Sequence, residues 1–208
     1  MPTRVRLFAV AVFIATASAL SGQNLLLNPS FELGSGFVAA DWTASDPAHA
    51  WRSHAVPATN GSYVLFVQPG YSISQVYAPA FEADSWTLSA SIMDPSVFQL
   101  SGINYGELEL RFTGSYGSES HVSAPFDAEQ KTDLWIPWSV SATAPAGTTG
   151  VEFLARLVEL DTSGGGALAF DYFSATQISV PEPSTLSLLA LGGATITARL
   201  GRGRKRAT

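Results

Sequence analysis

Apolar and polar residues alternate with a period of two along several stretches of this chain, which is the pattern of half-buried β-strands. Within residues 106–112 the two leucines and Phe112 share one face. Charged side chains occupy the other face, and we expect these to be solvated: Glu107, Glu109 and Arg111. Residues 85–92 alternate in the same way, with Trp86 in the inward set. The chain is therefore predicted to fold mainly as β-structure.

Further strand candidates are separated by turn-forming residues such as Asn60-Gly61 and Pro69-Gly70. These candidates cover residues 63–68, 71–78, 134–142, 151–157 and 168–178. Many short strands without a convincing helix predict an all-β domain of two antiparallel sheets packed face to face, and we expect a jelly roll. No internal repeat is visible, which argues against a propeller or a β-helix.

The N-terminal segment predicts export. Arg4 and Arg6 precede the apolar run 7–15, and Ala17-Ser18-Ala19 supplies small residues for cleavage. This order is typical of a secretory signal peptide, which we place at residues 1–22. The alternative, a first buried helix of the domain, offers no polar face to solvent. The folded domain is expected to span residues 23–179.

The C-terminal segment, residues 180–208, has a different composition. It opens with Pro181, Glu182 and Pro183, where two prolines end any preceding strand. An apolar stretch at 186–200 follows, for which we expect a short helix that enters a membrane, and then a basic end. Basic residues beside an apolar segment stay on the cytoplasmic side. The stretch is short for a full span of about 20 residues.

The ordered Pro-Glu-Pro motif, apolar segment and basic end resemble the PEP-CTERM protein-sorting signal. The resemblance covers about the last thirty residues. It implies sorting and cleavage by an exosortase in a Gram-negative-type bacterium that makes exopolysaccharide. The protein would pass through the inner membrane and then reach the cell surface or the extracellular matrix. A simple membrane anchor without processing is the alternative.

The domain itself begins with Asn24-Leu-Leu-Leu-Asn28-Pro-Ser-Phe31-Glu32. This strand resembles the first strand of CenC-type carbohydrate-binding modules and related galactose-binding-like jelly rolls. Looser similarities follow in the same order at Trp42, 59–63, 73–75, 135–147 and 170–173. The resemblance implies a non-catalytic, sugar-binding β-sandwich.

That family often holds one structural calcium ion where the first and last strands meet. Its matching carboxylates here are Glu32 and Asp171. Tyr172 stands where many relatives carry a second Asp, which removes one oxygen from the six to eight that calcium prefers. The alternative is that both carboxylates accept hydrogen bonds from the backbone.

Sugar binding requires aromatic rings that stack on the apolar faces of the sugar, together with polar groups that fix the hydroxyls. The aromatic residues nearest to turns and polar stretches are the candidate ligand-binding set: Trp42, Trp51, Tyr71, Tyr105 and Tyr116. Packing beneath the loops is the alternative role for the same rings. Trp86 and Trp135 lie on alternating strands and are expected in the core.

Composition excludes several other functions. Between residues 23 and 180, four cationic residues face sixteen carboxylates, so this segment would repel a nucleic-acid backbone. Cysteine is absent, which excludes disulfides and thiolate sites. The three histidines lack a metal-binding spacing. Glu107 and Glu109 share one strand face and are not opposed around a bond, as a glycosidase pair must be.

The sequence therefore predicts an exported, non-catalytic cell-surface or matrix protein that binds polysaccharide. The expected partners are an exosortase-type enzyme, a polysaccharide and the membrane at the C-terminal segment, and nucleic acid is not among them. A purely structural surface protein without a glycan ligand is the main alternative. A secreted hydrolase is the third.

Overall fold

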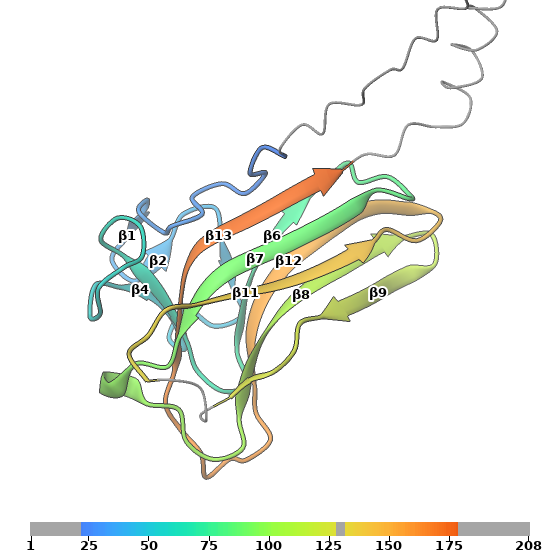
Figure 1. Cartoon of the computed structure of the whole chain (residues 1–208). Helices are drawn as coiled ribbons and strands as arrows, with labels where there is room; N and C mark the ends of the chain where they lie inside the picture. Colours follow the sequence, from blue (N-terminus) through green and yellow to red (C-terminus); the bar gives the residue numbers. More distant parts are fainter. Residues whose placement is uncertain (1–21, 128–131, 179–208) are drawn as a thin grey trace, which may run out of the picture.

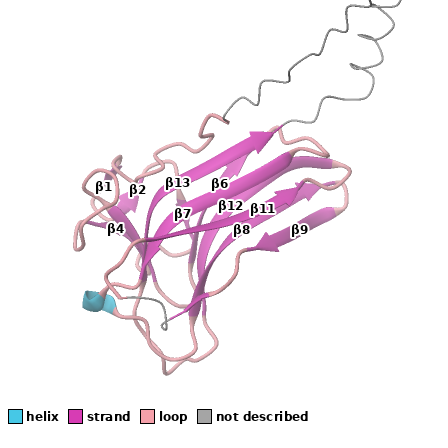
Figure 2. Ribbon diagram, viewed as in Figure 1, coloured by secondary structure: helices cyan, strands magenta, loops and turns pink. Residues whose placement is uncertain are grey.

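Two antiparallel β-sheets pack face to face in the computed structural model, which describes residues 22–127 and 132–178 (Figures 1 and 2). The larger sheet has the strand order β10–β8–β12–β6–β3, and β9 also pairs with β8. Its strands are β3 (Thr43–Ala44), β6 (Ser72–Tyr77), β8 (Tyr105–Gly114), β9 (Gly117–Val122), β10 (Phe126–Asp127) and β12 (Thr148–Val158). This arrangement confirms the predicted all-β sandwich.

The smaller sheet has the strand order β11–β7–β13–β5–β4. Its strands are β4 (Ala50–Ser53), β5 (Val64–Val67), β7 (Ser85–Met93), β11 (Ile136–Thr143) and β13 (Leu168–Ile178). A separate hairpin joins β1 (Gly34–Ser35) to β2 (Val38–Ala39). Among the described residues, the one helical element is the short 3-10 turn at Ser96–Phe98, and no helix there is long and apolar enough to cross a membrane.

The core lies between the two sheets and is built from the inward-facing residues of alternating strands. Trp86 on β7 is fully buried and contacts Phe153 on β12, with ring centroids 5.8 Å apart. Phe126 on β10 meets Trp138 on β11 edge to face at 5.4 Å. Burying each large apolar side chain stabilises the fold by about 1.5–3 kcal/mol. Contacts of this kind hold the sheets together.

The opening motif forms a corner of the domain. Asn28 adopts a φ of 46°, and its side chain bonds the backbone of Leu33 and Ala40 at 2.8–2.9 Å. Phe31 is fully buried against Trp42 and Phe173. A positive φ favours Asn over most residues, so the Asn-Pro-x-Phe-Glu motif is explained by the turn it makes and the ring it buries.

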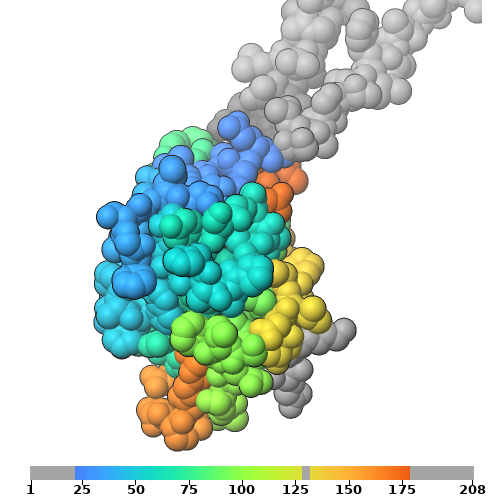
Figure 3. Space-filling view, turned by 90° about the vertical axis from the view of Figure 1, so that its left-hand side faces the viewer, coloured from blue at the N-terminus to red at the C-terminus, as the bar shows by residue number. Residues whose placement is uncertain are grey.

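Asn24 ties the start of the domain to its last strand. The Asn24 amide donates to the Phe173 carbonyl at 2.9 Å and accepts from the Ala175 N–H at 3.0 Å. The beginning of the described chain and the end of β13 consequently lie together at one end of the sandwich (Figure 1). In Figure 3, the N-terminal third covers much of one side, and the loop that joins β12 to β13 projects at the opposite end from these termini.

Candidate functional site

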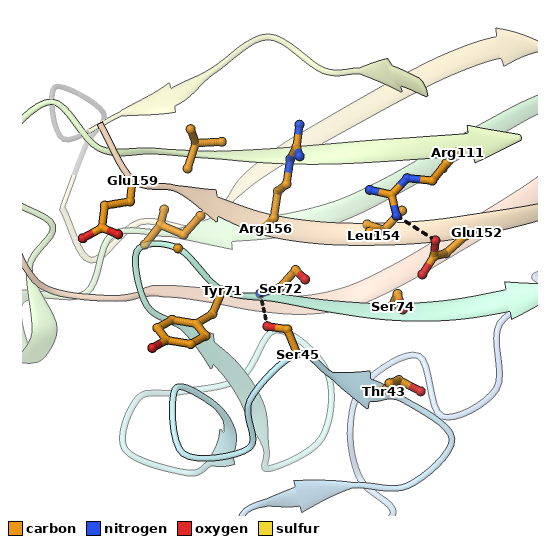
Figure 4. Close-up of a pocket in the computed structure, with 13 residues that line it drawn as sticks. Thr43, Ser45, Tyr71, Ser72, Ser74, Arg111, Glu152, Leu154, Arg156 and Glu159 are labelled. Carbon is orange, nitrogen blue, oxygen red and sulfur yellow. Dashed lines mark hydrogen bonds and ion pairs between the residues drawn. The ribbon is translucent and has the colours of Figure 1, made fainter. Parts of the chain in front are cut away.

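A groove of about 570 Å³ runs over the outer face of the larger sheet (Figure 4). Its floor comes from β3, β6, β8 and β12, and its left end in Figure 4 comes from the turn before β6 and the end of β12. Hydroxyl, charged and aromatic side chains share this surface. The lining residues are Thr43, Ser45, Gly70, Tyr71, Ser72, Ser74, Arg111, Glu152, Leu154, Arg156, Leu157, Val158 and Glu159.

An unbroken chain of ion pairs crosses β8 and β12 beside this groove. It runs in the order Glu107, Arg156, Glu109, Arg111 and Glu152. Arg111 Nε lies 2.9 Å from Glu109 Oε1, and Arg111 Nη1 lies 3.0 Å from Glu152 Oε2. Arg156 contacts Glu107 at hydrogen-bond distance and Glu109 Oε2 at 3.3 Å. Each guanidinium is therefore held between two carboxylates.

The strand register produces this chain of charges. Arg156 lies directly opposite Glu107, and Glu152 lies directly opposite Arg111, in the antiparallel β12–β8 ladder. Side chains directly opposite each other on one face of a sheet are close enough to interact. Period-two alternation then brings the charged residues of both strands to the outer face. Two strands distant in sequence thus combine to form one polar surface.

The expectation that Glu107 and Glu109 are solvated is wrong. Both face away from the core, but their exposed fractions are only 4% and 1%. The arginines cover them, and β9 lies beside β8, so that Ser120 donates to Glu109 Oε1 at 2.6 Å. Burial of a carboxylate requires such partners because removing an unpaired charge from water is costly.

Tyr71 lies at one end of the groove, and His49 stacks on its ring. The two ring centroids are 4.2 Å apart and the planes are within 5°. His49 Nδ1 in turn lies 2.8 Å from Asp46 Oδ2. The Ala48 N–H and the His49 ring hold the pKa of Asp46 below its usual range. This stack fixes the orientation of the one predicted aromatic residue that lines the groove.

The other four aromatic candidates lie elsewhere. Trp42 is buried rather than exposed, because its ring packs on Phe173 and its Nε1 donates to the Asn28 carbonyl at 3.0 Å. Trp51 is half-buried and stacks on Phe66 in the second apolar cluster. Tyr105 is half-buried at the start of β8. Tyr116 is exposed near the β8–β9 turn, where its hydroxyl lies 2.8 Å from Thr148 Oγ1.

The core prediction holds for Trp86, which is fully buried. Trp135 is half-buried against the second cluster and donates to the Pro57 carbonyl at 3.0 Å. The groove residues of β8 and β12 were not identified as a site from sequence. The charged residues at the outward positions of 106–112 and 151–157 were visible in the sequence. To recognise them as one site would have required knowing that these two segments pair.

Burial raises the pKa of Asp171, backbone N–H groups that bond the carboxylate oppose the increase, and the nearby charge of Glu32 adds to it. Asp171 Oδ2 accepts from the N–H groups of Thr59 and Asn60 at 2.7 and 2.9 Å. Glu32 Oε1 accepts from Ser62 and Tyr63, both at 2.8 Å.

These contacts bear on whether the two carboxylates fit a calcium ion. Backbone N–H groups donate to both oxygens of Asp171 and to Oε1 of Glu32, which calcium would need among its six to eight oxygen ligands. Within residues 22–127 and 132–178, no group of three or more Asp, Glu or His side chains is arranged to hold a metal ion. In this structure Glu32 and Asp171 fasten the 59–63 loop to the first and last strands, and calcium binding by the pair stays a prediction.

Pro181, Glu182, Pro183 and the apolar stretch 186–200 lie outside the described residues, so their identification rests on sequence comparison. A family model described as the PEP-CTERM protein-sorting motif matches the chain over residues 179–205. Residues 179–205 form a PEP-CTERM motif. The PEP-CTERM match confirms the resemblance drawn from the Pro-Glu-Pro, apolar and basic order. No curated protein matches the chain.

Solved structures confirm the fold of the domain that precedes the PEP-CTERM motif. The CBM22-1 xylan-binding domain of Paenibacillus barcinonensis Xyn10C aligns with a TM-score of 0.54 at 14% identity, over 76% of this chain and 97% of that chain. TmCBM61, solved in complex with β-1,4-galactotriose, aligns with a TM-score of 0.51 at 17% identity, over 75% and 99%.

A tailspike structure shares the same sandwich. The enzymatically active domain of bacteriophage CBA120 tailspike protein 4 aligns with a TM-score of 0.51 at 12% identity. The alignment covers 74% of this chain but only 21% of the tailspike chain. At these identities the similarity establishes the architecture, a carbohydrate-binding-module-like β-sandwich. The function has to be argued from the residues of the groove.

Proposed function

We propose that this chain is an exported surface protein that binds a glycan in the groove on the outer face of β3, β6, β8 and β12. The observation that carries the proposal is the combination of a fixed tyrosine ring, a row of hydroxyls and a chain of ion-paired side chains along one groove. Glycan chains present both apolar ring faces and hydroxyl groups, and this surface offers a partner for each.

The polar groups of the groove are held in place before any ligand binds. The Ser45 hydroxyl is held in place because its Oγ accepts a hydrogen bond from the backbone N–H of Ser72 at 2.9 Å. Arg111 is fixed at two positions by Glu109 and Glu152. Groups that are already ordered lose little conformational entropy on binding, which favours affinity for a weakly apolar ligand such as a sugar.

The solved structures support a glycan ligand. One relative is described as a xylan-binding domain, and another was solved with β-1,4-galactotriose. The alignment with this chain covers almost the whole length of both structures, so the similarity extends over the complete binding module in each. The tailspike and some other matches come from enzyme chains, of which this chain covers a minor part.

We propose binding without catalysis. A glycosidase needs two carboxyl groups on opposite sides of the scissile bond, about 5–9.5 Å apart, and one of them must donate a proton. Glu107 and Glu109 instead neighbour each other on β8, and both are engaged in ion pairs with arginines. This arrangement suits a structural and recognition role.

The PEP-CTERM motif supports the proposed location. A sorting motif at residues 179–205, together with the signal-peptide pattern of residues 1–22, favours export across the inner membrane and exosortase processing. In this proposal the domain is then released to, or retained at, the cell surface or matrix of a Gram-negative-type bacterium. Exopolysaccharide is the glycan that this location makes available.

Glycan-array binding with the purified full chain tests the proposal. We expect retention on at least one glycan class, with loss of binding in Tyr71→Ala. Tyr116→Ala is the matched control, because Tyr116 is exposed but lies outside the groove. Absence of binding to every glycan, with self-association instead, would support the purely structural alternative. Turnover of a glycoside would support a hydrolase.

A further inference from the structure

The arginines of the groove are outnumbered by carboxylates once their ion-pair partners are counted. The ion-pair chain together with Glu159 contains four carboxylates and two guanidiniums: Glu107, Glu109, Glu152 and Glu159 against Arg111 and Arg156. The lining alone, with Arg111, Arg156, Glu152 and Glu159, is neutral. Glu107 and Glu109 pair with these arginines from β8 without lining the groove, and adding them gives the groove and its ion-pair partners a formal charge of −2. In a partly enclosed surface, such a charge attracts cations and repels anions.

Both arginines of the groove are already paired with carboxylates. Arg111 is shared between Glu109 and Glu152, and Arg156 is shared between Glu107 and Glu109. The remaining arginine of the described chain, Arg52, is buried and donates to the backbone carbonyls of Phe31 and Glu32. A uronate or sulfate would meet guanidiniums whose charge two carboxylates already share, which weakens its attraction to them.

Glu159, in contrast, has a carboxylate that is free to bind. It is exposed and lines the groove, and within the described residues it makes no hydrogen bond or ion pair. Its Oε2 lies against the turn before β6, where a Cβ added to Gly70 would be 3.1 Å away. Tyr71 is the next residue, and Figure 4 shows both side chains at the same end of the groove.

We infer that the groove takes a glycan that carries free amino groups, with one ammonium paired to Glu159 and the adjoining sugar ring against Tyr71. This inference rests on the proposed glycan-binding function and names its ligand class. An ammonium group near a carboxylate forms a charge-assisted hydrogen bond, which is stronger than one to a neutral hydroxyl.

The test is isothermal titration of the full chain with three oligosaccharides at low salt: a β-1,4-linked glucosamine hexamer, the same hexamer fully N-acetylated, and an oligogalacturonate. At a pH where the amines are protonated, we expect the glucosamine hexamer to bind about two- to fivefold more tightly than the acetylated one, as expected for a partly exposed ion pair. We expect the oligogalacturonate to bind most weakly. The preference should shrink as salt screens the charges.

The matched variants are Glu159→Gln and Glu119→Gln. The first should bring the two hexamers to equal affinity, and the second should preserve the preference, because Glu119 lies on β9 outside the groove lining. Equal affinity of the hexamers in the unmodified chain, preference for oligogalacturonate, or no effect of Glu159→Gln would each overturn the inference while leaving glycan binding intact. If no oligosaccharide binds, the proposed function itself fails.

Discussion

The guanidinium carbon of Arg52 lies 3.2 Å from the centre of the Tyr63 ring. The same guanidinium donates to the carbonyl oxygens of Phe31 and Glu32, the second at 2.7 Å, while its side chain is 94% buried. One cation on β4 therefore holds the opening motif and the start of β5 together. These contacts of Arg52 join segments that lie far apart in the sequence.

Replacing Arg52 should destabilise the domain. We expect Arg52→Ala to lower the free energy of unfolding by about 2–4 kcal/mol, because two carbonyls lose charged donors and buried contacts are removed. Urea denaturation followed by tryptophan fluorescence measures this change. Arg52→Lys should recover only part of it, since an ammonium does not reproduce the planar fork. Equal stability of the alanine variant would contradict the role.

The ion-pair chain of the groove should show coupling between Glu109 and Arg111. Arg111→Gln leaves Glu109 buried with one fewer partner, and we expect a loss of about 1–3 kcal/mol. Glu109→Gln should be destabilising too, because Arg156 and Arg111 then face each other with less compensation. The double variant should cost less than the sum of the single variants. Strict additivity in a double-mutant cycle would show that the pair is not coupled.

Asp94 should make stability depend on pH. Burial raises its pKa above the ordinary value of 3.8, and the charge of Asp133 adds to the increase, while the N–H of Leu100 opposes it. Since the folded-state pKa is the higher one, protonation favours the folded chain. This stabilisation is complete at pH values below the pKa of Asp94 in the unfolded chain. It is lost as the pH rises through the higher pKa of Asp94 in the folded chain.

Asp94→Asn tests this expectation, because asparagine imitates the protonated acid and keeps an oxygen for the Leu100 N–H, which Asp94 Oδ1 accepts at 2.8 Å. We expect the variant to match the unmodified chain at acidic pH and to be more stable at neutral pH. Unfolding midpoints measured across that range give the comparison. A variant that is less stable at pH 7 would mean that the charged form of Asp94 is the one the fold prefers.

Calcium removal should leave the domain unchanged if Glu32 and Asp171 act as described. Because backbone N–H groups already bond both carboxylates, we expect the thermal midpoint to be the same with EDTA and with added calcium. Differential scanning calorimetry of the full chain measures both conditions. A lower midpoint in EDTA that added calcium restores would instead support the calcium site that the family resemblance implies.

Local pattern was enough to predict the long strands. The alternation in 85–92 and 106–112 identified β7 and β8, and the candidates at 151–157 and 168–178 became β12 and β13. β9 was missed because its sequence, Gly-Ser-Glu-Ser-His-Val, is almost wholly polar. Its formation depends on pairing with the edge of β8, which no period within the segment reveals.

The groove could be predicted only in part, for a related reason. Tyr71 was identified because it lies at a turn, as recognition residues often do. Arg156 and Glu107 are 49 residues apart, and only the register of β12 against β8 places them face to face. Burial of Glu107 and Glu109 likewise depends on neighbours contributed by other strands, so their own segment predicted solvation.

The last strand of the sandwich is a central one. β13 pairs with β7 on one side and with β5 on the other, and Asn24 fastens the start of the domain onto it. A load applied to the chain after residue 178 would therefore enter along the axis of β13. The hydrogen bonds of the β13–β7 ladder would share that load in shear instead of opening one at a time.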